Sequence, residues 1–137
     1  MILADTGFWL ALTNRSDRHH LRAKSAVNKI TEPLIVTWPV LTETCHLLLR
    51  LGVDAELRFI EAAARGSVQL FDLDASHFPR IATLLDKYRD LPMDLADASL
   101  VIAAEDMGTG AILSTDERDF RTYRWKNRKP FRNLLLD

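Results

Sequence analysis

The feature that most constrains this sequence is residues 95–104, an almost wholly apolar segment without Gly or Pro that has acidic residues at its start. Its length suits a helix better than a strand, and a helix that is apolar on every side is buried. The helix is expected within the stretch from Leu91 to Met107, and Gly108 predicts its C-terminal end. The rest of the chain is therefore expected to pack around this helix.

Asp94 and Asp97 lie in the first turn of the predicted helix, three residues apart and therefore on one face. A buried charge costs several kcal/mol unless it is paired, and the stretch contains no Lys or Arg. Asp94 alone has a structural interpretation as an N-cap residue. Asp97 is harder to explain in this way, because the cap position is taken and its neighbours are apolar. We therefore expect these carboxylates to bind a cation together with other acids.

Short apolar runs alternate with helical patterns along the whole chain. Strands are predicted at residues 1–4, 34–38, 67–73 and 111–114, with a fifth around 131–135. Helices are predicted at residues 8–13, 21–30, 40–51, 54–65 and 74–90 in addition to the buried one, with a turn or short helix at 115–120. This alternation predicts an α/β/α sandwich with a mostly parallel central sheet of four or five strands.

Composition narrows the class of protein. A length of 137 residues with 47% hydrophobic and 27% charged residues is ordinary for one soluble domain, 1–137. No apolar run is long enough for a membrane span, and the acidic Asp5 without a basic leader argues against a signal peptide. The lone Cys45 excludes an internal disulfide and a Cys-rich metal site. We expect a cytoplasmic protein that does not associate with membranes.

Five acids are expected to meet at one edge of the sheet. Asp5 ends the first strand, Asp116 follows the fourth, and Glu43 lies early in the helix after the second strand, on its core-facing side. Asp94 and Asp97 open the helix that precedes the fourth strand. In parallel sheets the functional crevice lies beyond the carboxyl ends of the strands. Each acid alone has an alternative interpretation as a cap or turn residue, but their shared edge indicates a site.

A cluster of carboxylates repels itself unless cations are present. Oxygen ligands without Cys or convergent His select hard ions, so Mg²⁺ or Mn²⁺ is expected, as one or two ions. Such ions activate water and stabilise a leaving oxygen, which predicts hydrolysis of phosphodiesters. Thr6 and Ser114 are candidate hydroxyl donors to water or carboxylate, or alternatively turn and capping residues.

Four motifs in order resemble the PIN domain, and in particular the VapC-type toxin ribonucleases. They are LAD at the start, WPVLTETCHLLLR, MDLADASLV and ILSTDERDF, and together they cover essentially the whole chain. The resemblance assigns the family's acidic set to Asp5, Glu43, Asp97 and Asp116, with Asp94 as an additional acid near the site.

The same resemblance matches Ser114 to the family's Ser or Thr before the last acid, and Asp119 with Phe120 to its acid–Phe pair. It implies a Mg²⁺- or Mn²⁺-dependent endoribonuclease, a homodimer, and a cognate antitoxin whose C-terminal segment occupies the active-site groove. Two alternatives within the family are an RNA-maturation nuclease and a non-catalytic module that binds RNA or protein. A small-molecule phosphatase is disfavoured, because Gly7 stands where a second Asp after Asp5 is usual.

A basic segment lies near the C-terminus. Residues 117–132 hold seven bases and two acids, a local charge of +5 in a chain of net charge −1. Arg118, Arg121 and Arg124 are the candidate RNA contacts, with Tyr123 and Trp125 available for base stacking. The alternative is a charged strand edge whose aromatic residues belong to the core.

The first helix carries a second apolar group, Phe8, Trp9 and Leu12, near the apolar residues of 55–64. These residues are candidates for a dimer or antitoxin surface, and core packing is the alternative.

Overall fold

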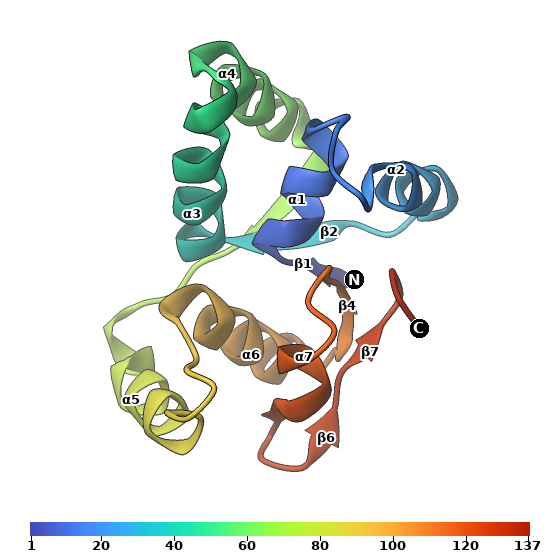
Figure 1. Ribbon diagram of the computed structural model, residues 1–137. Helices are drawn as coiled ribbons and strands as arrows, with labels where there is room; N and C mark the ends of the chain where they lie inside the picture. Colours follow the sequence, from blue (N-terminus) through green and yellow to red (C-terminus); the bar gives the residue numbers. More distant parts are fainter.

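The computed structural model describes residues 1–66 and 68–137. Its centre is a sheet of five parallel strands in the order β3-β2-β1-β4-β7 (Figure 1). The strands are β1 (Ile2–Ala4), β2 (Leu34–Thr37), β3 (Val68–Phe71), β4 (Ala111–Leu113) and β7 (Arg132–Asn133). In the middle strand, Leu3 pairs with Ile35 on one side and with Ile112 on the other. The predicted parallel sheet is confirmed.

Helices cover both faces of this sheet (Figure 1). One layer holds α1 (Thr6–Thr13), α2 (His20–Lys29), α3 (Trp38–Leu48) and α4 (Val53–Ala62). The other holds α5 (Phe78–Lys87), α6 (Leu95–Met107) and α7 (Asp119–Thr122). Shorter helical turns are η1 (Leu49–Leu51), η2 (Ala63–Ser67) and η3 (Ala75–His77). The arrangement is the expected α/β/α sandwich. Among the described residues, no helix is long and apolar enough to cross a membrane.

The predicted buried helix is α6. Every residue from Ala98 to Ala104 is buried, and Gly108 ends the helix in the left-handed conformation, with φ of 70°. The hydroxyl groups of Thr37 and Ser99, 2.6 Å apart, join the helix to the end of β2. This contact fixes the N-terminal half of α6 at the edge of the sheet where the strands end.

Several predicted boundaries are wrong. Trp38 begins α3 instead of ending β2, because the Thr37 side chain caps the helix and Pro39 lies in its first turn. The stretch 91–94 lies before α6, which begins at Leu95. The helix predicted at 74–90 is the short turn η3 followed by α5, and the latter ends at Lys87.

The C-terminal tail differs most from its prediction. The strand expected around 131–135 is only Arg132–Asn133, parallel to β4. Before it, β5 (Arg124–Trp125) and β6 (Lys129–Pro130) form an antiparallel hairpin that the sequence pattern does not predict. Its loop places Lys126 and Asn127 at positive φ, and for lysine this conformation has no sequence signal.

Candidate active site

Asp5 is a buried carboxyl group at the end of β1. Its Oδ1 accepts a hydrogen bond from the backbone N of Phe8 at 3.0 Å, which caps α1, and its Oδ2 accepts one from Ser114 Oγ. Burial raises the pKa of Asp5 to about 6 against the effect of these two hydrogen bonds, and the charges of Asp116 and Glu43 raise it further. Asp5 therefore caps α1, and its ionised form is disfavoured by burial and by the neighbouring negative charges.

Asp116 is held by the loop that follows β4. Its backbone N donates to Ser114 Oγ at 3.0 Å, so this hydroxyl bridges Asp5 and the Asp116 backbone. Asp116 Oδ1 accepts hydrogen bonds from the backbone N atoms of Arg118 at 2.9 Å and Asp119 at 2.8 Å. The candidate role of Ser114 as a hydroxyl donor to a carboxylate is thus present in the structure.

Asp97 points one carboxyl oxygen at a tyrosine. Its Oδ2 accepts a hydrogen bond from the Tyr123 hydroxyl at 2.9 Å. Burial raises the pKa of Asp97 to about 7, and the charge of Asp94 adds to this shift, while the bond from Tyr123 opposes it. Burial, reinforced by the Asp97 charge, also raises the pKa of Tyr123. The pair is a half-buried carboxyl group and a buried phenol that donates to it.

Asp94 takes the structural role that the sequence left open. It is exposed and is the N-cap of α6, where its Oδ1 accepts a hydrogen bond from the backbone N of Asp97 at 2.8 Å. Its charge still acts on Asp97 and on Glu43. Asp94 is therefore an N-cap that also borders the cluster.

Glu43 reaches the same place from α3, where it is half-buried. Burial raises the pKa of its carboxyl group, and the nearby Thr6 hydroxyl opposes this shift. Thr6 Oγ1 is itself buried, and none of the described residues forms a hydrogen bond of normal geometry with it. The buried Thr6 hydroxyl therefore lies next to the Glu43 carboxyl group at the wall of the cavity.

All five acids line one cavity of about 280 Å³ at the carboxyl edge of the sheet, where the sequence predicts them. Its lining consists of Asp5, Thr6, Gly7, Leu10, Val40, Glu43, Leu47, Asp94, Ala96, Asp97, Leu100, Thr115 and Asp116. They come from α1, α3, α6 and the loop after β4, which are far apart in the sequence. Asp119 is buried but does not line this cavity, and burial raises its pKa.

The donor set fits a hard divalent cation. Carboxylate and hydroxyl oxygens are its preferred ligands, and the raised pKa values of Asp5 and Asp97 show carboxylates that lack a positive partner. Among the described residues, no three acidic, His or Cys side chains are already close enough to share an ion.

The three candidate RNA-binding arginines all have partners within the chain. Arg118 Nε donates to Asp119 Oδ1 at 3.0 Å, and Arg121 lies 3.6 Å from Asp137. Arg124 Nη1 donates to three backbone carbonyls at the end of α7, which is a structural role. Arg118 and Arg121 remain largely exposed, at 72% and 66% of the side chain, and so are the better placed for a ligand.

The aromatic residues of the tail belong to the core, as the alternative interpretation predicts. Tyr123 is fully buried and Trp125 is 8% exposed, so neither presents a face for base stacking. Lys129 lies over the Trp125 ring at 4.7 Å from its centre. The basic segment can therefore attract RNA by its positive charge, but these two rings are not available to stack on bases.

Sequence reasoning missed two residues that hold the acids in place. From the sequence, Tyr123 is expected either in the core or in contact with RNA, and its hydrogen bond to Asp97 is not predicted. Asn133 donates from Nδ2 to the Ser114 carbonyl at 2.9 Å, and its Oδ1 accepts from the Ser114 backbone N at 3.2 Å. Both contacts depend on how the C-terminal tail packs, and no local sequence pattern reports that packing.

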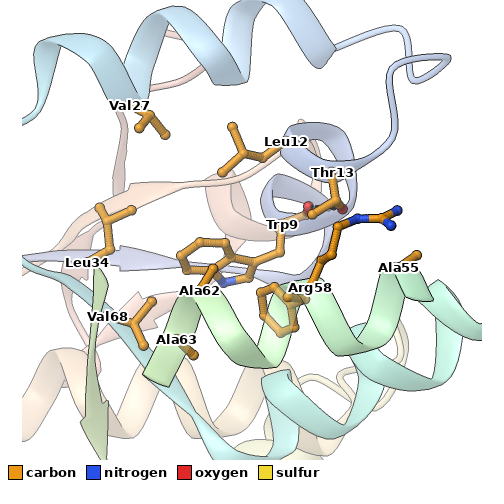
Figure 2. Close-up of a pocket in the computed structure, with 11 residues that line it drawn as sticks. Trp9, Leu12, Thr13, Val27, Leu34, Ala55, Arg58, Ala62, Ala63 and Val68 are labelled. Atoms are coloured by element: carbon orange, nitrogen blue, oxygen red, sulfur yellow. Dashed lines mark hydrogen bonds between the residues drawn. The ribbon is translucent and has the colours of Figure 1, made fainter. Parts of the chain in front are cut away.

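A second cavity, of about 420 Å³, lies among α1, α2, α4 and the ends of β2 and β3 (Figure 2). Phe8 and Trp9 are buried, so the core-packing alternative holds for both. Trp9 and Leu12 nevertheless border this cavity, with Arg58 and apolar residues of α4. Trp9 Nε1 is buried and has no hydrogen-bond partner in the described part of the chain.

The strand order and the acidic cavity place the chain among α/β proteins that have a cluster of carboxylates at the carboxyl ends of the strands. Comparison of the sequence with known protein families identifies which of these it is. The PIN domain family matches residues 2–126. The chain therefore belongs to the PIN domain family, which confirms the predicted resemblance.

Individual relatives are VapC proteins. Ribonuclease VapC26 of Mycobacterium tuberculosis (strain ATCC 25618 / H37Rv) is 30% identical over 124 residues, which span 90% of this chain and 92% of the relative. The crystal structure of VapC20 from the same species, a toxin that cleaves the sarcin–ricin loop, superimposes with a TM-score of 0.80. It is 23% identical and covers 86% of this chain and 92% of its own, so it supports the fold.

Proposed function

We propose that this chain, acting as a single PIN-like domain over residues 1–137, is a Mg²⁺- or Mn²⁺-dependent endoribonuclease and the toxin of a toxin–antitoxin pair. The observation that carries the proposal is the cavity in which five acids from four separate parts of the fold converge. Membership of the PIN family and the 30% identity to a VapC ribonuclease support RNA as the substrate.

The metal site in this proposal consists of Asp5, Glu43, Asp97 and Asp116, with Asp94 at its border. One or two bound ions supply a lowered pKa for water and stabilise the leaving oxygen of the phosphodiester. Hydrolysis adds water across one P–O bond, so one RNA fragment keeps the phosphate and the other gains a hydroxyl. Thr6, which lines the cavity beside Glu43, supports the set by keeping its hydroxyl next to the Glu43 carboxyl group.

The remaining residues position this set. Ser114 fixes Asp5 by donating to its Oδ2, and Asp119 supplies one of the backbone N–H groups that fix Asp116. Arg118 and Arg121 provide positive charge beside Asp116 for the RNA backbone. Arg124 contributes to the positive field but also holds the end of α7.

The proposal is tested by incubating total cellular RNA with purified protein and Mg²⁺, Mn²⁺ or a chelator. Discrete fragments that require metal are expected, and Asp97→Asn abolishes them. Asp54→Asn, at an exposed acid early in α4, is the matched control and cleaves like wild type.

Three results would count against it. Fragments that persist in chelator or in Asp97→Asn exclude the acidic cavity as the active site. Metal and RNA binding without cleavage favours the non-catalytic binding module. Removal of a few defined nucleotides from one precursor RNA favours the RNA-maturation nuclease.

We place the antitoxin partner partly in the apolar cavity beside Trp9, because its mostly apolar walls suit a protein segment with apolar side chains. Val27→Glu puts a charge at this cavity and is expected to weaken antitoxin binding, measured by calorimetry. Val53→Glu, at a residue that is 69% exposed and does not line the cavity, is the control. Equal affinity of both variants contradicts the placement.

The oligomer and the location are also part of the proposal. We expect a homodimer in the cytoplasm, as the family resemblance implies. Sedimentation of the purified chain, of mass 15.6 kDa, gives twice this mass if the expectation is correct.

A further inference from the structure

We propose that Tyr123 is a positioning residue of the metal site, whose hydroxyl holds the Asp97 carboxylate in the orientation that binds the ion. The inference rests on the proposed function, because it concerns the same acidic cavity. It adds a residue from the C-terminal tail to a site otherwise built from acids, Thr6 and Ser114.

The contact is a single well-formed hydrogen bond. Tyr123 OH donates to Asp97 Oδ2 at 2.9 Å. Among the described residues nothing donates to Asp97 Oδ1, while Asp97 also lines the cavity of the acids. One oxygen of the carboxylate is thus engaged by the protein, and the other is free for a ligand.

The phenol is held rigidly where it makes this contact. Tyr123 has an exposed fraction of 0% and directly follows α7. Its ring packs edge-on against Tyr88, with centres 4.9 Å apart, and against Phe120, with centres 5.2 Å apart. A side chain fixed on two sides can hold a carboxylate with little loss of entropy on metal binding.

The competing explanation is that Asp97 merely satisfies a core tyrosine, since a buried phenol needs a partner. In this explanation, Asp97 serves only as the hydrogen-bond acceptor that the buried Tyr123 hydroxyl needs. Such a role would be energetically unfavourable, because the same carboxyl group lies half-buried among the other acids of the cavity and its pKa is raised. Tyr88, the neighbouring tyrosine, is satisfied without any acid: its hydroxyl accepts from the Arg124 backbone N at 3.0 Å.

Asp5 shows the same arrangement at the other side of the cavity. Ser114 Oγ donates to Asp5 Oδ2, as Tyr123 donates to Asp97 Oδ2. The buried Asp5 and the half-buried Asp97 are therefore each oriented by a hydroxyl group from a buried residue of the C-terminal region. Partners that orient metal ligands in this way commonly change metal affinity or activity by about 10- to 100-fold when removed.

The two tyrosines provide a matched pair of variants. Tyr123→Phe and Tyr88→Phe each remove one buried hydroxyl and keep the ring packing, so both are expected to lower thermal stability slightly. The readout is Mn²⁺ affinity of the RNA-free protein by calorimetry. We expect Tyr123→Phe to weaken Mn²⁺ binding at least about 10-fold, and Tyr88→Phe to leave it within about 2-fold. In RNA cleavage, Tyr123→Phe at fixed Mn²⁺ lowers kcat and leaves KM for RNA unchanged.

The outcomes separate this inference from the proposed function. Wild-type protein that binds no Mn²⁺ overturns both. Wild-type binding with equal affinity in Tyr123→Phe overturns the inference alone, and so does an equal loss in the two variants, which is the result of a purely structural role.

A spectroscopic measurement tests the contact without removing Tyr123. The chain contains two tyrosines, so Tyr88→Phe leaves Tyr123 as the single one. The tyrosine ring doublet in the Raman spectrum of Tyr88→Phe is expected to report a strong hydrogen-bond donor, and adding Asp97→Ala is expected to abolish that signature. A doublet that does not respond to Asp97→Ala contradicts the contact.

Discussion

At the residue scale, the buried Asp5 and the half-buried Asp97 characterise the site, because neither has a basic partner among the described residues. Their pKa values are raised to about 6 and about 7, mainly by burial. Near neutral pH both groups are poised between their protonated and ionised forms. A bound cation would remove the unfavourable free energy of keeping these carboxylates ionised, and this relief would contribute to its binding.

The raised pKa values predict how stability depends on pH. A carboxyl group whose folded pKa exceeds its unfolded value of about 3.8 favours the folded state below that pH and loses this contribution as pH rises through 6 to 7. For Asp5 alone the loss is up to roughly 3 kcal/mol, at about 1.4 kcal/mol per pKa unit. Metal-free protein should therefore have a lower free energy of unfolding at pH 8 than at pH 5, measured by urea denaturation.

Asp97→Asn is the internal control for this pH effect. It removes one of the two titrating groups, so metal-free Asp97→Asn is expected to be more stable than wild type at pH 8 and to show a smaller decline from pH 5. Added Mn²⁺ should restore stability to wild type at pH 8 far more than to the variant. A wild-type protein whose stability rises from pH 5 to pH 8 without metal contradicts the assigned pKa directions.

At the element scale, the two-residue strand β7 stabilises the loop that carries Ser114. Asn133 is 6% exposed and binds the backbone of Ser114 on both its N–H and its carbonyl. Its Oδ1 also accepts from the Leu135 backbone N at 3.1 Å. The strand thus fixes the residue whose hydroxyl holds Asp5.

Asn133→Ala is expected to destabilise the protein by about 2 kcal/mol or more, because it leaves buried backbone groups without partners. The free energy of unfolding measures this loss, and cleavage activity should fall with it. Asn28→Ala, at an exposed position on α2, serves as the control and should change stability by about 0.5 kcal/mol or less. Similar stability of the two variants would show that β7 does not hold the Ser114 loop.

Elements with a strong local signal were predictable from the sequence. The helix α6 follows from its apolar run and from Gly108, and the shared edge of Asp5, Glu43 and Asp116 follows from parallel topology. The hairpin β5–β6 was missed, because its turn uses Lys126 and Asn127 at positive φ in place of glycine. The hydrogen bond between Tyr123 and Asp97 was missed because it joins residues from separate elements through packing alone.

At the scale of the whole molecule, the chain combines an acidic cavity with a basic C-terminal segment. Residues 117–132 carry a net +5 although the chain carries −1. In the function we propose, the RNA backbone approaches the acids from the side of Arg118 and Arg121.

Removing this charge should change the salt dependence of RNA binding. Arg118→Gln with Arg121→Gln is expected to weaken binding and to flatten the slope of log K against log salt by about 0.7 for each RNA phosphate that the protein no longer neutralises. Fluorescence anisotropy in the Asp97→Asn background measures binding without cleavage. Arg22→Gln with Lys24→Gln, two exposed bases on α2, is the charge-matched control. An unchanged slope in the first pair places the RNA elsewhere.

The most direct test of the central claim, that the acidic cavity hydrolyses RNA with a bound divalent ion, is cleavage in water enriched in oxygen-18. The ends of the fragments are then analysed by mass spectrometry. Activation of water predicts oxygen-18 in the terminal phosphate of each cut, no 2′,3′-cyclic phosphate, and no product with chelator. An unlabelled cyclic phosphate that forms with or without metal would show attack by the RNA's own 2′-hydroxyl and would contradict the account.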